Sequence, residues 1–163
     1  HMVAVLAHAL GVIRRDIFHQ PCDVNALATA ALYHDASEIL TGDLPTPIKY
    51  HNAEIMSAYH AVEDLAVQKL LGMLPPELRE TYAAVLAEDK DGDIYPLVKA
   101  ADKLSAYIKC IEERKAGNNE FLSAEAQTRA ALEASPLPEV QYFLEHFIPA
   151  FERDLDELGA IGQ

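Results

Sequence analysis

Residues 31–49 read Ala31-Leu-Tyr-His34-Asp35-Ala-Ser-Glu38-Ile-Leu-Thr-Gly-Asp43-Leu-Pro-Thr-Pro-Ile-Lys49. His34 continues the apolar face of Leu27 and Ala31 at helical spacing, so an imidazole is expected where a core side chain would lie. Asp35 follows directly, and Glu38 lies about one helical turn further on. A neutral imidazole beside a carboxylate is a common ligand pair for a divalent cation, and a nearby carboxylate can handle a proton or a water. This stretch therefore predicts a metal-dependent hydrolase.

A His-Asp dipeptide arises easily by chance, so support must come from elsewhere in the chain. Asp102 lies on a second, strongly apolar predicted helix, where a carboxylate needs a partner because burying a bare charge costs free energy. Taken singly, His34 also fits a core histidine, and Asp102 fits a salt bridge to Arg14 or Lys109. Their occurrence together with further acidic groups favours a metal site.

Other catalytic schemes find less support. The sequence has no Gly-x-Ser-x-Gly elbow, phosphate-binding Gly-rich loop or His-Glu-x-x-His motif. Cys22 follows a proline with no histidine clearly placed to activate it, and we interpret it and Cys110 as structural. Glu38 and Asp43, taken singly, also fit a solvated helix end and a turn cap.

The composition limits the class of protein. With 163 residues, 50% of them hydrophobic, the chain fits one soluble domain. The net charge of −13 argues against nucleic acid or an anionic membrane as partners, because neutralising phosphates takes clustered Lys and Arg. A bound cation and basic groups such as Lys49, Lys103 and Lys109 would reverse this field for a phosphorylated substrate. Two cysteines without disulfide spacing, and no membrane-length or signal-peptide pattern, predict a cytoplasmic protein.

Apolar residues recur with the helical period along nearly the whole chain, which predicts an all-α fold. Helices are expected over residues 2–15, from a cap at Asp23 or Asn25 to Thr41-Gly42, and over residues 52–72, 75–87, 94–115, 120–134 and 138–158. Two prolines should stiffen residues 43–50 and hold Asp43 and Lys49 in place. Residues 88–93 should form a surface loop.

With His34-Asp35 on one helix and Asp102 on another, the sequence resembles the HD-domain phosphohydrolase superfamily. Residues 33–50, 99–110 and 117–121 resemble, more specifically, the bacterial HD-domain 5′-deoxynucleotidases of the YfbR type. This resemblance extends from Val3 to about Leu158. It implies a compact HD-domain helical bundle, one domain over residues 1–163, that removes the 5′ phosphate from deoxyribonucleoside monophosphates and is commonly a homodimer.

The resemblance also implies residue roles. It implies that His34, Asp35 and Asp102 bind one divalent transition metal, which is Co, Mn, Zn, Ni or Fe. Glu38 and Asp43 match the family's catalytic acids: Glu38 would orient or deprotonate the attacking water, and Asp43 would assist proton transfer to the leaving oxygen. Lys49 is the candidate substrate-binding residue. The sequence leaves four points open: which acid activates the water and which protonates the leaving oxygen, the native metal, the base preference and the oligomeric state.

One departure concerns the beginning of the chain. The family's further metal-binding histidine, in a Glu-His-Ser motif, aligns just before His1. Either the N-terminal part of the family domain is missing, which is the expectation we favour, or the metal site is incomplete. Two alternative functions keep the HD motif: hydrolysis of a nucleoside triphosphate, cyclic nucleotide or alarmone, and nucleotide binding by a catalytically silent module. Glu38 and Asp43 argue against the silent module, because metal binding alone would not require them.

Overall fold

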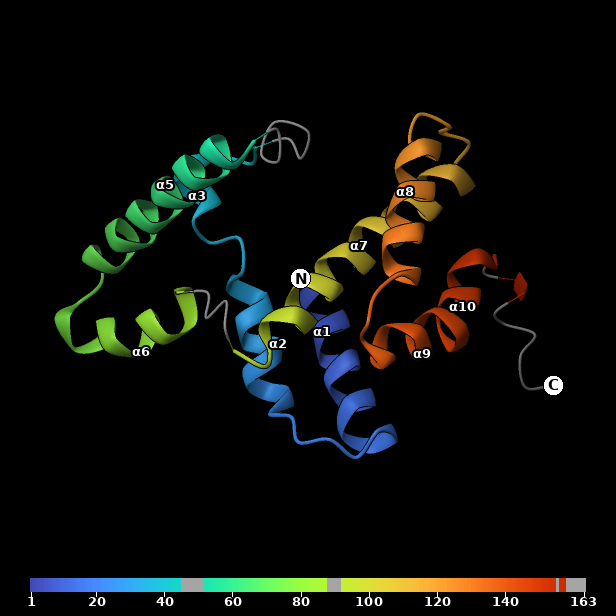
Figure 1. The fold of residues 1–163 in the computed structure, drawn as a ribbon, viewed down its shortest axis with the longest axis horizontal. Coiled ribbons are helices and arrows are strands. Elements are labelled where there is room, and N and C mark those ends of the chain that lie inside the picture. Colours follow the sequence, from blue (N-terminus) through green and yellow to red (C-terminus); the bar gives the residue numbers. More distant parts are fainter. Residues whose placement is uncertain (45–51, 88–91, 155, 158–163) are drawn as a thin grey trace. The chain divides into compact units, whose positions relative to one another are not determined.

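The computed structural model describes residues 1–44, 52–87, 92–154, 156 and 157, and every regular element in these ranges is helical (Figure 1). The elements are α1 (Met2–Val12), the π-helical turn η1 (Ile13–Ile17), α2 (Val24–Tyr33), α3 (Glu38–Thr41), α5 (Ala53–Gly72), α6 (Pro76–Leu86), α7 (Tyr95–Lys115), α8 (Leu122–Glu133), α9 (Pro138–His146) and α10 (Ile148–Glu152). No helix in the described ranges is long and apolar enough to cross a bilayer. The predicted all-α fold is confirmed.

Contacts group the chain into two compact units. Unit 1 comprises His1–Ala31 and Gly92–Gln163, and unit 2 comprises Leu32–Asp91. Each unit has its own internal packing, described below. The prediction of one domain over residues 1–163 stays a prediction.

The core of unit 1 forms around the apolar face of α7. Its side chains recur every three or four residues, which places them on one side of the helix, and α1 packs along that side. Fully buried members include Leu97, Leu104 and Ile111 of α7 and Leu10 of α1. Side chains of α2, α8, α9 and α10 complete the same cluster. Removing this apolar surface from water is the main favourable term in folding.

A buried ion pair ties three segments of unit 1 together. Arg14 of η1 donates from Nε to Oε1 of Glu139 at 2.5 Å, and the side chain of Glu139 is fully buried. Nη1 of Arg14 also donates to the carbonyl of Asp93, just before α7, at 3.4 Å. Arg14 is therefore engaged with α9, although the sequence offered it as a partner for Asp102.

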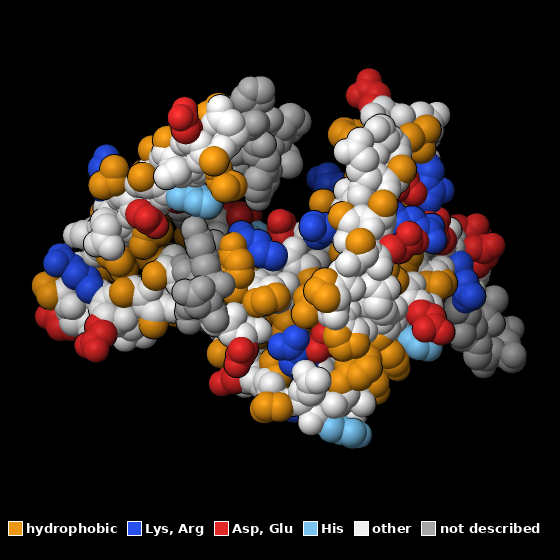
Figure 2. Space-filling view, in the orientation of Figure 1, with side chains coloured by type: hydrophobic (Ala, Val, Ile, Leu, Met, Phe, Trp, Pro, Cys, Tyr) orange, Lys and Arg blue, Asp and Glu red, His pale blue; other side chains and the backbone are white. Residues whose placement is uncertain are grey.

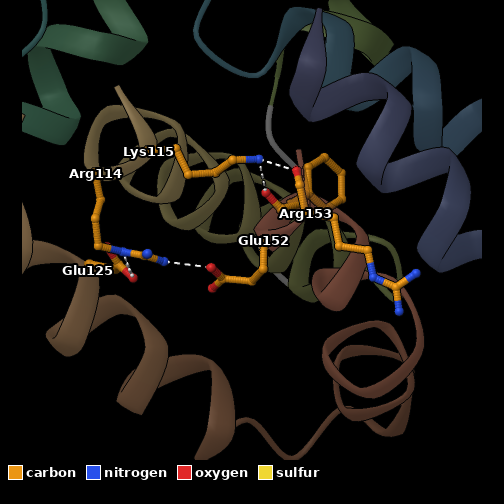
Figure 3. A network of polar contacts seen from close by, with 6 residues as sticks. Arg114, Lys115, Glu125, Glu152 and Arg153 are labelled. Carbon is orange, nitrogen blue, oxygen red and sulfur yellow. Dashed lines mark hydrogen bonds and ion pairs between the residues drawn. The ribbon is translucent and has the colours of Figure 1, made fainter. Parts of the chain in front are cut away.

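A second polar network fixes the C-terminal end of α7 (Figure 3). Arg114 donates from Nε to both carboxylate oxygens of Glu125 on α8, at 3.1 and 3.0 Å, and from Nη2 to Glu152 on α10 at 2.7 Å. Lys115 donates to the backbone carbonyls of Phe151, at 2.9 Å, and of Arg153. These bonds satisfy carbonyls at the end of α10 and join three helices.

Unit 2 has a much smaller interior. Ala66 and Leu71 of α5 are its buried apolar residues among those described, whereas large apolar side chains such as Ile39 and Leu65 are exposed. Figure 2 shows apolar side chains over the surface of α5 and α6. Local hydrogen bonds therefore carry more of the order in this unit. Asn52, for example, caps α5 by accepting from the backbone N–H of Ile55 at 2.8 Å.

Most predicted helices are confirmed within a few residues, including the cap at Asp23, whose Oδ1 accepts from the backbone N–H groups of Asn25 and Ala26. Two predictions of continuous helices were wrong. The helix after Asp23 ends at Tyr33, residues 34–37 form a turn, and α3 follows. Short polar side chains such as those of Asp and Ser compete for backbone hydrogen bonds, which disfavours a helix interior there.

The second correction concerns residues 138–158. The helix stops at His146 and α10 begins at Ile148, because Pro149 has no N–H for a continued helix and fits only a first turn. Residues 45–51 and 88–91, and with them the expected stiff connection and most of the surface loop, lie outside the described ranges.

The Arg14–Glu139 pair yields a stability prediction. Arg14→Ala should lower the free energy of unfolding by about 3 to 5 kcal/mol, because it leaves a fully buried carboxylate without its cation. Arg15→Ala is the matched control, since Arg15 pairs with Asp16 at the surface and should cost at most about 1 kcal/mol. Urea unfolding followed by circular dichroism measures both. Equal losses in the two variants would contradict the structural role of the buried pair.

Candidate active site

His34 and Asp35 face each other at the start of unit 2. The imidazole Nε2 lies 2.8 Å from Oδ2 of Asp35, and the two side chains are 10% and 52% exposed. The sequence prediction that His34 turns inward is thus confirmed, while Asp35 remains accessible. A largely buried nitrogen and an accessible carboxylate oxygen converge on one point.

This donor pair fits a divalent cation. Nitrogen and oxygen ligands lie about 2.1 Å from such an ion, so two adjacent donors at a right angle are about 3 Å apart. The observed separation of 2.8 Å between Nε2 and Oδ2 matches that spacing. Imidazole and carboxylate together suit transition metals, whereas Ca²⁺ takes oxygen ligands. His34 and Asp35 are therefore close enough to serve as neighbouring ligands, and the same distance fits a hydrogen bond between them.

Glu38 and Asp43 lie at the two ends of α3. Glu38 begins this one-turn helix and is half-buried. Asp43 follows the C-cap residue Gly42 and is exposed. The backbone N–H of Gly42 donates to the carbonyl of Glu38 at 2.9 Å, so one hydrogen bond spans the segment between the acids. Gly42 adopts φ +70° and ψ 165°, a conformation available essentially to glycine alone.

α3 is held against α5. The two helices pack together, and the hydroxyl of Tyr59 on α5 donates to the carbonyl of Gly42 at 3.1 Å. Tyr33, just before His34, makes an edge-to-face contact with Tyr82 of α6, with ring centroids 6.2 Å apart. The candidate residues of unit 2 thus lie on backbone that α5 and α6 support.

Asp102, the third predicted metal ligand, belongs to unit 1. It is exposed on α7, one turn after Lys99, whose ammonium lies 5.4 Å from the ring centroid of Tyr95. Within the described ranges, no three His, Cys, Asp or Glu side chains gather closely enough to hold a metal ion. Because the predicted ligands are divided between the units, the complete set stays a prediction. Lys49 lies outside the described residues.

The two cysteines do not offer an alternative nucleophile. Cys22 and Cys110 are both free thiols and partly buried. Burial raises the pKa of the Cys22 thiol, and it raises the pKa of Cys110 as well. A thiol protonated at neutral pH is a weak nucleophile, which supports the structural interpretation of both residues.

Comparison with known proteins gives the family. A family profile for "5'-deoxynucleotidase YfbR-like" proteins matches residues 1–151. The chain belongs to this family. It is 50% identical over 158 residues to the 5′-deoxynucleotidase YfbR of Shigella flexneri serotype 5b, an alignment that covers 96% of this chain and 79% of the relative. Over the same span it is 49% identical to the protein of that name from Escherichia coli K12.

A solved structure supports the same conclusion. The crystal structure of an HD-domain phosphohydrolase from Listeria innocua matches with a TM-score of 0.79 and 26% identity, covering 92% of this chain and 73% of that one. The predictions of an HD-domain fold and of a hydrolase of this family are confirmed. Membership in the family also implies a divalent metal.

Sequence reasoning missed two residues with long-range contacts, Tyr59 beside the candidate site and Glu139 in unit 1. Tyr59 lies in a helical pattern, where an aromatic residue is ordinarily interpreted as a packing residue. Nothing in the neighbouring sequence predicts its hydrogen bond to the carbonyl of Gly42, 17 residues away. Glu139 sits in a predicted first helical turn, where an acidic residue ordinarily faces water. Both depend on long-range contacts.

The conformation of Gly42 yields a second prediction. Gly42→Ala should lower the free energy of unfolding by about 1 to 3 kcal/mol, because φ +70° with ψ 165° is strained for any residue with a Cβ. Gly72→Ala is the control: an added Cβ meets open space at both positions, but Gly72 has no positive φ and should lose nothing. Urea unfolding reports both, and a loss of the same size at Gly72 would contradict the argument.

Proposed function

We propose that this protein removes the 5′ phosphate from deoxyribonucleoside monophosphates, with one divalent transition metal as cofactor. The observation that carries the proposal is the family match over residues 1–151, which contains every candidate residue. The His34–Asp35 donor pair and the two acids on either side of α3 supply the groups that the reaction needs. A cytoplasmic location and a homodimer belong to the same proposal.

The metal would be held by His34, Asp35 and Asp102. Once bound, it would offset negative charge on the phosphoryl oxygens and lower the pKa of a water molecule. This addition of positive charge is needed because the chain has a net charge of −13 and the substrate is itself an anion. Mn, Fe, Co, Ni and Zn all suit mixed nitrogen and oxygen ligands.

The two acids divide the proton transfers. Glu38 orients or deprotonates the water that attacks the phosphorus, and Asp43 assists protonation of the leaving 5′ oxygen. If the two acids exchange these roles, both are still required. The single turn of α3 keeps the two acids in the same segment. Lys49 is proposed to bind the substrate.

The division of labour is testable by substitution. Glu38→Gln and Asp43→Asn should each reduce kcat by about 10²- to 10⁴-fold, because proton-transfer help contributes that much, while binding of Mn²⁺ is kept. His34→Ala should instead weaken Mn²⁺ binding measured by calorimetry. Circular dichroism checks the fold of all three. Near-normal kcat in either acid variant would refute its assignment, and unchanged Mn²⁺ affinity in His34→Ala would refute the ligand.

The substrate class is tested with a panel of nucleotides. Phosphate release should be fast from deoxyribonucleoside 5′-monophosphates of every base. For matched ribonucleotides kcat/KM should be about 5- to 150-fold lower, because the 2′ hydroxyl would be buried without a hydrogen-bond partner. The sequence reason is the stiff wall expected from Pro45 and Pro47. Equal rates for deoxy and ribo substrates would overturn the selectivity. Faster hydrolysis of a triphosphate, cyclic nucleotide or alarmone would support the alternative hydrolase, and no hydrolysis would support the silent module.

A further inference from the structure

The carbonyl of Gly42 is the meeting point of two hydroxyl groups. Oγ1 of Thr41 donates to it at 2.9 Å, and the hydroxyl of Tyr59 donates to it at 3.1 Å. The bond from Thr41 is local to α3. The bond from Tyr59 comes from α5, and it links the end of α3 to a separate element.

The peptide that follows this carbonyl leads directly into Asp43. Rotation about the Gly42 backbone would swing the carbonyl and the Asp43 carboxylate together. A glycine has the freedom to make this rotation, since it populates positive and negative φ with similar ease. Fixing the carbonyl therefore fixes the direction in which Asp43 leaves α3.

α5 is a suitable anchor for such a bond. It has 20 residues, its N-terminus is capped by Asn52, and it contributes Ala66 and Leu71 to the interior of unit 2. Tyr59 is half-buried on this helix. Its hydroxyl bond to the Gly42 carbonyl links the end of α3 to this regular helix.

We propose that Tyr59 is a positioning residue for Asp43 and acts through the Gly42 carbonyl. This inference rests on the proposed function, because it assigns to Tyr59 a part in placing one of the two acids. The Gly42 N–H, which belongs to the preceding peptide unit, donates to the carbonyl of Glu38. Gly42 therefore connects the two acids, and a bond that fixes its carbonyl bears on the position of Asp43 relative to Glu38. Tyr59 itself does not touch the reacting atoms.

The expected effect is on turnover. Tyr59→Phe removes only the hydroxyl and should reduce kcat about 10-fold, the consequence of losing one positioning hydrogen bond, with KM and Mn²⁺ affinity unchanged. Tyr142→Phe is the matched control. Tyr142 is also half-buried, it lies on α9 of unit 1, and phenylalanine would keep its ring contact with Phe18.

A double-mutant cycle separates positioning from general damage. Tyr59→Phe is measured in the wild-type protein and in the Asp43→Asn variant, with the deoxyribonucleoside monophosphate panel and Mn²⁺. A residue that acts through Asp43 loses its effect once that carboxylate is gone, so the 10-fold loss should shrink to less than 2-fold in the Asp43→Asn background. Thermal unfolding accompanies each variant. If Tyr59→Phe fails to fold, Thr41→Val, which removes the other bond to the same carbonyl, takes its place in the cycle.

The outcomes are distinct. An equal loss in both backgrounds, or wild-type kcat in Tyr59→Phe, would overturn the positioning role while leaving the proposed function intact. Full turnover in Asp43→Asn would refute the catalytic role of Asp43 and with it the positioning role of Tyr59. No hydrolysis by the wild-type protein would instead refute the proposed function on which the inference rests. A 10-fold loss that also appears in Tyr142→Phe would show a nonspecific cost of removing a hydroxyl and would likewise overturn the role of Tyr59.

Discussion

Burial of the apolar face of α7 is the constraint on which the structure of unit 1 depends. α1 and α8 both pack against α7, and α2, α9 and α10 contribute further side chains to the same cluster. The polar contacts of this unit are placed around that core: Arg14 reaches the fully buried Glu139, and Arg114 fixes the far end of α7. Asp102 occupies the opposite, exposed side of the same helix, so the core orients a chemical group without including it.

Unit 2 is organised on a different physical basis. With few buried apolar residues, it relies on caps, turns and single hydrogen bonds to shape residues 32–44. Such bonds contribute modestly to stability, about 1 kcal/mol each, but they are directional. Directional bonds suit a segment that carries His34, Asp35, Glu38 and Asp43, because these groups must face a particular way. The conformation of this segment is thus fixed by local, directional hydrogen bonds more than by burial of apolar side chains.

The sequence predicted what local patterns encode. Helical periodicity located most of the helices, Asp23 was one of the two residues predicted as a cap, and the inward side of His34 followed from its spacing. Continuous helices were wrongly predicted through residues 34–37 and at Phe147, because periodicity persists across a break that the backbone cannot bridge. Tyr59 and Glu139 escaped notice, since their roles depend on partners far along the chain. The ligand set and the roles of the acids came from the family resemblance and not from spacing.

The shielded thiols have a practical bearing on how such an enzyme behaves. Because burial raises the pKa of both Cys22 and Cys110, little thiolate is present near neutral pH. Oxidants and alkylating reagents act mainly on the thiolate. Both thiols should therefore react more slowly with such reagents than an exposed cysteine would.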